Sequence, residues 1–179
     1  MLSEREVLST LEMLRNEHLD VRTVTMGISL LDCASHDADR FRKQIHAKIS
    51  TLARDLVRIC DEVGDKYGIP VVNKRIAVSP IAVVGAPFSS GQLVNIAHTL
   101  DMSAEEVGVD FIGGFSALVE KGFTKSDLAL IEAIPEALSK TERVCASVNV
   151  ASTRAGSTLR QTDMTCGQRV WNRHPTPWT

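Results

Sequence analysis

Aromatic residues are scarce in this 179-residue sequence, which contains five Phe, two Trp and one Tyr. Proteins that bind nucleic acid commonly stack bases on aromatic side chains and present a strongly basic surface. Here the formal net charge is −2, so neither feature supports nucleic-acid binding. The composition therefore predicts a protein with no nucleic-acid partner.

Long apolar runs are also missing. No stretch reaches the roughly 18 consecutive apolar residues that a membrane-spanning helix needs. The chain opens with Ser3, Glu4, Arg5 and Glu6 instead of a basic patch followed by an apolar segment, so no secretory signal is predicted. We expect a cytoplasmic protein with no membrane partner.

The four cysteines lie far apart without a C-x-x-C pair, and the five histidines are scattered. This spacing predicts neither a structural zinc site nor a disulfide scaffold, and it indicates no metal and no identifiable cofactor. Three cysteines have apolar neighbours and are predicted to be buried, reduced thiols: Cys33, Cys60 and Cys145.

Apolar residues make up 44% of the sequence, as expected of one domain with a single core. A capping box at Ser3-x-x-Glu6 predicts the start of a helix. The residues that repeat at helical spacing in it are Val7, Leu11, Leu14 and His18. Helical spacing predicts further helices over Phe41–Val63, Gln92–Val107, Ser116–Lys121 and Ser126–Thr141. Apolar, β-branched stretches predict strands over Val21–Ala34, Ile76–Val84, Val109–Ile112 and Arg143–Ser152.

Strands and helices thus alternate along the chain, and each connection is long enough for a helix to cross over the sheet. Such alternation is typical of an α/β fold with parallel strands, either a layered sheet or part of a barrel. Pro80 lies inside the second predicted strand, where it cannot donate a ladder hydrogen bond, so it indicates an edge or an irregularity.

The last part of the sequence has a different character. From Arg154 to the end there are four arginines and one aspartate, and both tryptophans lie in the last nine residues. The helical and strand patterns stop near Ser157. Two explanations stay open: a C-terminal arm that contacts a partner through Trp171 and Trp178, or an out-of-frame stretch foreign to the fold.

Four blocks carry a close resemblance to a known family: TVTMGISLLDC, GIPVVNKRIAVSPIAVVG, VGVDFIGGFSALVEKG and VCASVNVASTRAG. They resemble, in unbroken order up to about residue 156, the bacterial and archaeal uncharacterised protein family 0210, also called domain of unknown function 711 or "PFL family protein". Members of that family are more than twice as long as this chain. The resemblance therefore implies an N-terminal barrel portion over residues 1–156, truncated relative to the family, and an atypical, disordered or out-of-frame tail over 157–179.

The resemblance also implies a fold and an assembly. The expected fold is a ten-stranded α/β barrel like that of pyruvate formate-lyase and anaerobic ribonucleotide reductase, with this chain forming most of one half-barrel. Family members resemble homodimers, and the family brings no established activity. Radical chemistry does not follow from the barrel, because a fold alone does not determine a function.

Parallel α/β structures bind ligands at the carboxyl ends of their strands. Polar residues and glycines predicted near strand ends are therefore candidates for ligand binding: Asn73, Lys74, Arg75, Gly113, Gly114, Ser116, Ser147, Ser152 and Thr153. Lys74 and Arg75 together could hold an anionic substrate, with Arg75 offering a planar fork. A solvated strand entry would explain the same two residues.

Gly113 and Gly114 are predicted where a strand becomes a helix. Either glycine could adopt a positive φ, bring the backbone close to a ligand and leave Ser116 near a helix N-cap. The pair is shorter than any full phosphate-loop fingerprint, and a tight turn without a ligand is the simpler alternative.

Two residues are candidates for a catalytic role. Asp110 lies one residue into the predicted apolar strand Val109–Ile112, so a buried carboxylate there could be a general base or the structural partner of a cation. Asn149 alternates with apolar residues in ASVNVAST, so Asn149 and Ser147 are predicted on one polar, wet face. Contact with a ligand and contact with ordered water are equally consistent with that face.

These candidates support two functions. The first is a barrel that binds or transforms a small anionic metabolite. The alternative is a non-catalytic regulatory or structural homodimer with an interface on the helix predicted over Asp37–Val63. In either case the isolated chain would be an incomplete half-barrel with open sheet edges, and we expect it to be inactive and aggregation-prone.

Overall fold

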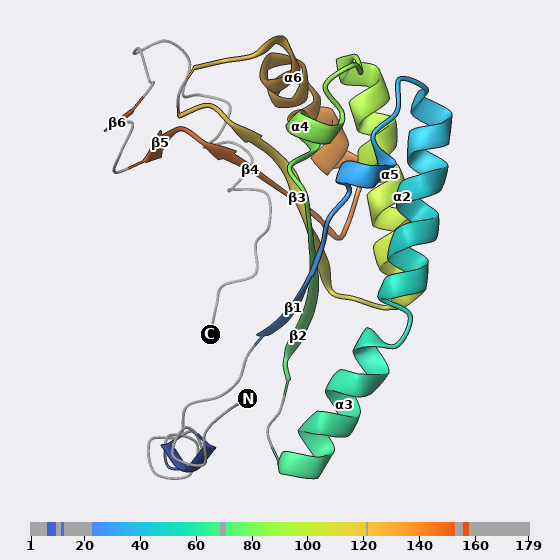
Figure 1. The fold of residues 1–179 in the computed structure, drawn as a ribbon, viewed down its shortest axis with the longest axis vertical. Helices are drawn as coiled ribbons and strands as arrows, with labels where there is room; N and C mark the ends of the chain where they lie inside the picture. The colour runs from blue at the N-terminus through green and yellow to red at the C-terminus, as the bar shows by residue number, and fades with distance from the viewer. Residues whose placement is uncertain are drawn as a thin grey trace.

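Strands and helices alternate along the chain in the computed structural model (Figure 1). The structure describes residues 7–9, 12, 23–68, 71–120, 122–152 and 156–157. The helix predicted from the Ser3-x-x-Glu6 capping box lies almost wholly outside these residues. The tail lies outside them from residue 158 onward.

Four parallel strands form the main sheet in the order β1-β2-β3-β4. They are β1 (Thr23–Ile28), β2 (Asn73–Val78), β3 (Phe111–Leu118) and β4 (Val144–Asn149). Both β1 and β4 are edge strands, so the described part of the chain forms an open sheet and not a closed ring. The α/β class with parallel strands is confirmed.

Helices make every connection between neighbouring strands. They are the short 3-10 helix η1 (Leu31–Cys33), α2 (Ala38–Leu52), α3 (Leu56–Tyr67), α4 (Ile81–Val84), α5 (Ser90–Val107) and α6 (Lys125–Ser139). Side chains fix where the long helices begin. The Asp37 carboxylate accepts hydrogen bonds from the first turn of α2, and a capping box between Thr124 and Asp127 begins α6.

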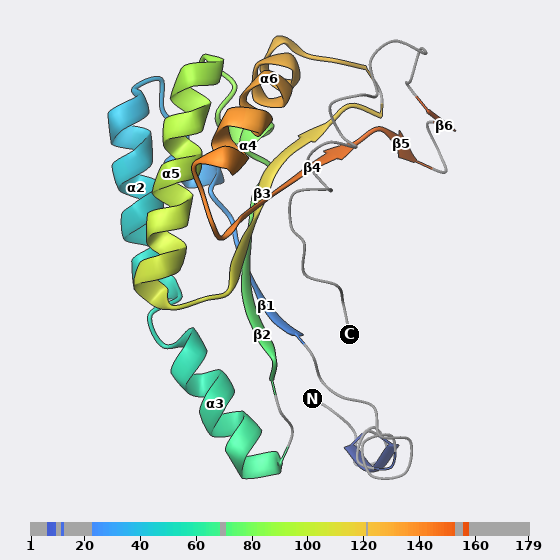
Figure 2. The same ribbon diagram turned by 180° about the vertical axis from the view of Figure 1, so that it is seen from behind.

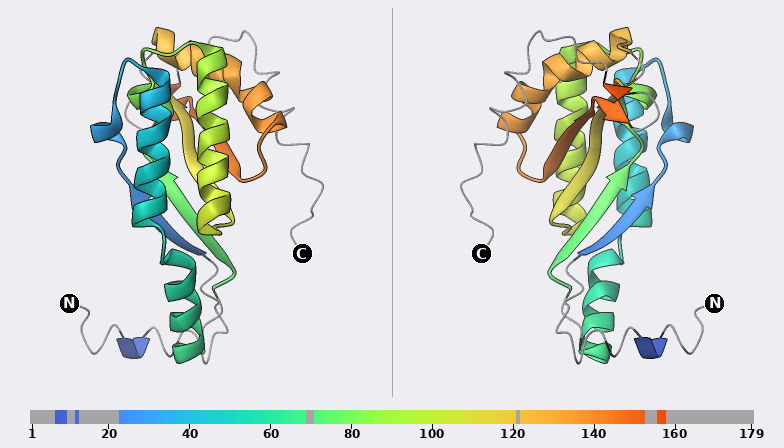
Figure 3. Two further views of the ribbon diagram at one scale, coloured as in Figure 1. Left: turned by 90° about the vertical axis from the view of Figure 1, so that its right-hand side faces the viewer. Right: turned by 90° about the vertical axis from the view of Figure 1, so that its left-hand side faces the viewer.

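All of these helices lie on the same face of the sheet. The two views of Figure 3 show the helices in front of the strands from one side and the bare strands in front from the other, and Figure 2 shows the same two layers edge-on. Parallel crossovers are almost always right-handed, so strands added in sequential order place every helix on one side. We call the uncovered side the open face.

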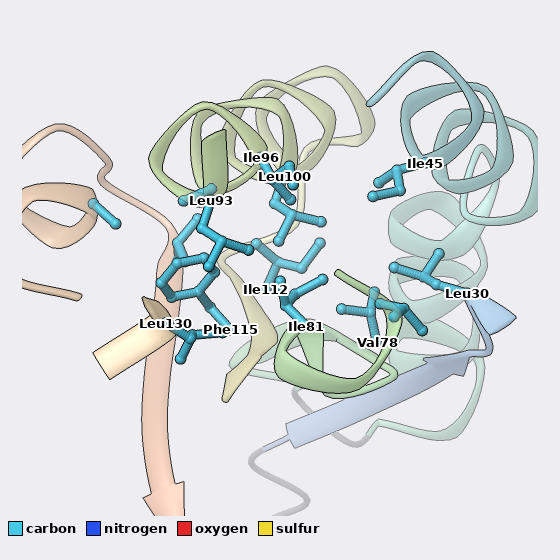
Figure 4. Close-up of a cluster of buried hydrophobic side chains, with 14 of the residues drawn as sticks. Leu30, Ile45, Val78, Ile81, Leu93, Ile96, Leu100, Ile112, Phe115 and Leu130 are labelled. Atoms are coloured by element: carbon cyan, nitrogen blue, oxygen red, sulfur yellow. The ribbon is translucent and has the colours of Figure 1, made fainter. Parts of the chain in front are cut away.

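The core lies between the sheet and the helices. Figure 4 shows apolar side chains of β2, β3, α2, α4, α5 and α6 meeting there. The largest fully buried side chains are Phe41, Phe115, Leu30, Ile45, Ile49, Ile76, Ile81, Leu93, Ile96, Leu100, Ile112 and Leu130. Each strand therefore contributes to the core only through the side chains that face the helices.

The long predicted helix over Phe41–Val63 is two helices. The helix α2 ends at Leu52, and α3 begins at Leu56 after a turn that contains the fully buried Ala53. Neither glycine nor proline marks this turn, so the unbroken apolar stripe predicted one continuous helix. The break lets α2 pack against α5 while α3 follows the amino end of β2.

Two other predicted elements also differ from the structure. The second strand ends at Val78, because Pro80 is the N-cap of α4 and does not lie within the ladder. The short helix predicted over Ser116–Lys121 is wrong, since residues up to Leu118 belong to β3. A small antiparallel pair, β5 (Ala151–Ser152) with β6 (Gly156–Ser157), was not predicted.

Candidate functional site

The side chains of β2 point alternately toward the helices and toward the open face. Ile76 and Val78 are buried in the core. Because successive strand residues face opposite sides, Asn73, Arg75 and Ala77 lie on the open face. The cation Arg75 thus stands on the side of the sheet that no described helix covers.

Arg75 lies in the interior of the sheet, where its Cα pairs with those of Thr25 on β1 and Phe111 on β3. Its guanidinium carbon is 5.4 Å from the centroid of the Phe111 ring, close enough for a cation–π contact. The Nε atom is buried without a hydrogen-bond partner, and among the described residues the guanidinium makes no hydrogen bond or ion pair. The Phe111 ring therefore restrains the guanidinium, and no carboxylate among the described residues pairs with its charge.

Two other half-buried arginines show the usual arrangement. The Nε of Arg42 donates a hydrogen bond to Thr99 Oγ1 at 2.8 Å. The guanidinium of Arg143 donates to the carbonyl oxygen of Val109 at 2.9 Å. Burying an N–H donor without a partner is unfavourable, so the Nε of Arg75 is the exception that a bound anion near this guanidinium would explain.

A row of small residues crosses the open face next to Arg75. In the order of strand pairing these residues are Gly27, Ala77, Gly113 and Cys145. A Cβ atom at Gly27 would meet nothing within 4 Å, and one at Gly113 would meet only the carbonyl oxygen of Ile76 at 4.0 Å. The face beside Arg75 therefore has room above the backbone.

Gly114 is the extra residue of a β-bulge in β3. Gly113 pairs with Cys145 and Phe115 pairs with Ala146, which leaves Gly114 without a partner on β4. Its φ is 119°, in the region that L side chains rarely adopt. The predicted strand-to-helix turn at Gly113 and Gly114 is therefore wrong, because both glycines lie inside a strand.

The bulge changes which residues of β3 reach the open face. Beyond it, Phe115 and Ala117 are fully buried against the helices, so alternation places Ser116 on the opposite side, where it is itself largely buried and donates a hydrogen bond to the carbonyl oxygen of Gly114 at 3.4 Å. Ser116 pairs there with the exposed Ser147 of β4. A one-residue shift exchanges the two faces of a strand, and without the bulge Phe115 would lie on the open face.

Cys145 belongs to the open face and is exposed, which corrects the prediction that it is buried. Its neighbours Val144 and Ala146 face the helices, so alternation turns Cys145 away from the core. Desolvation by surrounding atoms raises the pKa of the Cys145 thiol, and the Arg75 guanidinium lowers it by a smaller amount. Cys33 and Cys60 are buried free thiols, as predicted.

The structure separates the two predicted cations. Lys74 faces the helices, where its Nζ lies 2.7 Å from Asp61 Oδ1 of α3. The hydrogen bond that Lys74 donates to Asp61 raises the pKa of Lys74, against a smaller opposing effect of desolvation. Of the two predicted cations, Arg75 is therefore the one that lies on the open face.

The two candidate catalytic residues lie at opposite ends of the sheet and each has a partner. Asp110 Oδ2 accepts a hydrogen bond from the backbone N–H of Lys74 at 2.7 Å, which ties the start of β3 to the start of β2. Asn149, the last residue of β4, donates through Nδ2 to Glu120 Oε2 at 2.7 Å. They do not form a common site in this structure.

The remaining predicted residues divide between the two ends as well. Asn73 pairs with Thr23 at the amino end of the open face. Ser152 pairs with Gly156 in the small antiparallel ribbon, and Thr153 lies outside the described residues. The candidates predicted near the strand ends are thus not gathered at one end of the sheet. Several of them lie along the open face instead.

Sequence reasoning missed three residues of this face: Thr25, Phe111 and Cys145. Alternation alone could have found Thr25, because Met26 and Ile28 on either side of Gly27 face the core. Phe111 and Cys145 looked like core residues by composition. Only the pairing of β2 with β3, and of β3 with β4, places them beside Arg75.

Two hollows in the helix layer are lined by none of the predicted residues. One hollow of about 240 Å³ lies between α2 and α5, and another of about 440 Å³ lies beside η1 and α2. Within the described residues, no three side chains are grouped as metal ligands. None of the helices in that part of the chain is both long enough and apolar enough to cross a membrane.

Comparison with known proteins gives a consistent family match. The family described as "Uncharacterised ACR (DUF711)" matches residues 12–172. A "UPF0210 protein" of Syntrophobacter fumaroxidans is 67% identical over 156 residues, and one of Methanosarcina mazei is 56% identical over 156 residues. Each alignment covers 87% of this chain but 34% of the relative, so the chain spans about a third of the length of these relatives.

Proposed function

This chain belongs to the family described as Uncharacterised ACR (DUF711), and we propose that its open face binds a small anionic metabolite around Arg75. The family description names no activity, so the proposal rests on the geometry of this chain. The observation that carries it is the half-buried Arg75 guanidinium, which makes no hydrogen bond or ion pair to any described residue.

The chemistry of the face suits a carboxylate or a phosphate. A guanidinium offers parallel N–H donors that match two oxygens of either group. The Phe111 ring restricts where that guanidinium can lie, which lowers the entropy lost when it binds. The small residues Ala77 and Gly113 leave space beside it for the rest of a ligand.

We further propose that the longer relatives enclose this face in a closed barrel. Sequential parallel strands with helices on one side are the arrangement found in closed α/β barrels, whose strands present their other face to the interior. Apart from Phe111 and the exposed Leu118, the open face carries mainly polar and small side chains, which suits a wet interior that holds a ligand better than a dry core. This chain would then form most of one half-barrel of the pyruvate formate-lyase-like type.

The enclosed state would strengthen binding, because electrostatic attraction to Arg75 increases when water is excluded. The isolated chain, with its face in water, is expected to bind weakly and to be inactive. Whether the ligand is transformed depends on groups beyond Arg75. Roles for Asp110 and Asn149 in catalysis, and a regulatory or structural homodimer, stay predictions.

The proposal can be tested by NMR titration of the chain with inorganic phosphate and with citrate. We expect saturable shifts of the backbone resonances of Arg75, Gly113 and neighbouring residues of the open face. Charged hydrogen bonds contribute about 1.5–3 kcal/mol, so Arg75→Ala should weaken binding roughly tenfold or more. Arg75→Lys should retain part of the affinity.

The control is Arg58→Ala, which removes an exposed arginine of α3 that is paired with Asp55 and Glu62. It changes the net charge by the same amount without altering the open face. Equal affinities in Arg75→Ala and the unmodified chain would refute the proposal. Shifts confined to the helix layer would refute it as well.

A further inference from the structure

Cys145 lies diagonally across Gly113 from the guanidinium of Arg75. That guanidinium lies over the ring of Phe111, the residue of β3 that pairs with Arg75. Because alternate residues of a strand share a face, Gly113 is the next residue of β3 on the open face. Gly113 pairs in turn with Cys145 of β4. The cation and the thiol are therefore separated by a position that has no side chain.

Three observations indicate that a ligand belongs at this position. The Nε of Arg75 is buried and has no hydrogen-bond partner among the described residues. A Cβ atom at Gly113 would meet only one carbonyl oxygen, at 4.0 Å, so the space above the glycine is open. Desolvation raises the pKa of the Cys145 thiol and the Arg75 guanidinium lowers it by less, so the charge of Arg75 acts as far as the thiol.

The gap between the two groups is short. Neighbouring strands are about 4.8 Å apart and residues two apart on a strand about 6.6 Å, so Cys145 is roughly 8 Å from a group over Phe111. A carboxylate oxygen accepts a hydrogen bond from a guanidinium at about 2.8 Å. The carbon next to the carboxylate lies about 2.4 Å farther on, and its contact with sulfur spans about 3.5–4 Å. A two-carbon acid is therefore long enough to contact both groups.

We propose that Arg75 and Cys145 contact opposite ends of the same ligand, a small carboxylic acid that lies over Gly113. This inference rests on the proposed anion site, and it names the class of ligand and a second residue that contacts it. The guanidinium of Arg75 binds the carboxylate. The thiol of Cys145 packs against the carbon atoms next to the carboxylate and limits the length of the ligand.

The protonation state of the thiol is compatible with a bound acid. Because desolvation raises its pKa, the thiol of Cys145 is neutral at neutral pH and does not repel a carboxylate. A neutral thiol behaves as a small apolar group and a weak donor. Cys145 therefore contributes selectivity for a short acid, and the single charge of Arg75 matches one carboxylate.

Alkylation of Cys145 at alkaline pH tests this arrangement. Iodoacetate is a two-carbon acid, and iodoacetamide is its neutral analogue. In both reactions the thiol proton is lost to the buffer, the thiolate forms a C–S bond, the C–I bond breaks and iodide leaves. Peptide-level mass spectrometry gives the rate at Cys145 for each reagent. The ratio of the two rates does not depend on the thiol pKa, because both reagents attack the same thiolate.

We expect the ratio of the iodoacetate rate to the iodoacetamide rate to be at least tenfold higher in the folded chain than in the urea-unfolded chain. The iodoacetate rate should also saturate with concentration. Arg75→Ala should lower the ratio to the unfolded value, whereas the control Arg58→Ala should leave it unchanged. Equal ratios in the folded and unfolded chain would overturn the proposal.

Gly113→Val separates a bound acid from attraction at a distance. This variant keeps the charge of Arg75 but fills the space over which the acid would lie. Loss of the preference for iodoacetate would support a bound acid. A preference that survives in Gly113→Val would show that the charge acts only at a distance, and it would overturn the proposal.

Competition in the unsubstituted chain provides a measurement that no substitution can disturb. Propionate should slow the reaction of Cys145 with iodoacetate, whereas propionamide at the same concentration should not. Equal effects of the two would overturn the proposal.

The phosphate titration distinguishes failure of this inference from failure of the anion site. Phosphate shifts that depend on Arg75, together with no preference for iodoacetate, would retain the anion site and place its ligand away from Cys145. Absence of both results would remove the anion site itself.

Discussion

Gly114 lies so close to Val78 on the neighbouring strand that a Cβ atom at position 114 would be 2.5 Å from Val78 Cγ2 and 2.6 Å from its carbonyl oxygen. No side chain can occupy that space unless the backbone of β2 moves. The contact exists because the bulge presses Gly114 toward β2 while Phe115 turns into the core. Glycine is therefore required here by both space and conformation.

Replacing Gly114 with alanine should destabilise the fold strongly. The positive φ and the collision with the Val78 backbone each cost free energy, and together we expect a loss of roughly 3 kcal/mol or more. Gly113→Ala is the matched control, because its Cβ would meet only one oxygen at 4.0 Å. Chemical denaturation would measure both variants, and similar losses in the two would contradict this account of the bulge.

A larger residue at position 113 should block the ligand face without harming the fold. Gly113→Val places a β-branched side chain in a strand, where such residues are well tolerated. It would fill the space beside Arg75, so we expect phosphate binding to weaken at least tenfold while the denaturation midpoint changes little. Gly113→Ala should bind nearly as well as the unmodified chain. Undiminished binding by Gly113→Val would place the ligand elsewhere.

The thiol of Cys145 should report the charge of Arg75. Because desolvation raises its pKa, Cys145 is protonated at neutral pH and alkylation should be slow there. The nearby guanidinium opposes this shift, so Arg75→Ala should raise the thiol pKa further and move the pH–rate profile of alkylation upward. Arg75→Lys should leave the midpoint close to its original value. Peptide-level mass spectrometry would follow Cys145, and an unchanged midpoint in Arg75→Ala would show that the two groups do not interact.

The Lys74–Asp61 pair should make stability depend on alkaline pH. The pKa of Lys74 is raised above its usual value of 10.5 in the folded state, chiefly by Asp61. The pair's stabilisation is therefore complete below about pH 10.5 and disappears as the pH rises through the higher folded-state pKa. Asp61→Asn should be less stable than the unmodified chain at pH 8, and the difference should close in strong alkali.

The control for this measurement is Asp65→Asn, which removes another exposed carboxylate of α3. Urea denaturation across the pH range would compare the three proteins. Asp65→Asn should track the unmodified chain throughout. A pH-independent gap for Asp61→Asn would mean that packing, not charge, accounts for the effect.

The sequence predicted the order of elements well because each depends on local patterns. The helical spacing over Gln92–Val107 and Ser126–Thr141 and the β-branched run before Leu30 are all visible within a few residues. The class of fold follows from that order, since long crossovers allow only parallel neighbours. Ordinary sequence reasoning was sufficient for these features.

The features that needed the structure depend on residues far apart in the chain. The bulge at Gly114 is visible only in the pairing of β3 with β4, and nothing near Gly114 in the sequence distinguishes a bulge from a turn. The break between α2 and α3 has no glycine or proline to mark it. Strand pairing shows the bulge, and the packing of α2 on α5 and of α3 beside β2 accompanies the break.

The candidate site was predicted only in part, because its grouping also depends on residues far apart in the chain. Arg75 was identified as an anion-binding residue, but the pattern gave it Lys74 as a companion, although neighbours on a strand point to opposite sides. Asp110 was identified as a carboxylate needing a partner, and its partner is the backbone N–H of Lys74. The chemical role of each candidate residue could be predicted from its type. Which candidates lie together could not, because that depends on the face of the sheet to which each side chain points.

One-sided coverage of the sheet divides every strand into two independent sets of positions. Ile76 or Phe115 cannot change without repacking the interior, whereas Thr25, Ala77 or Ser147 can be exchanged with little mechanical effect on the fold. A protein engineer could therefore rewrite what this scaffold recognises by altering alternate residues along its strands, while leaving intact the side chains that make it fold.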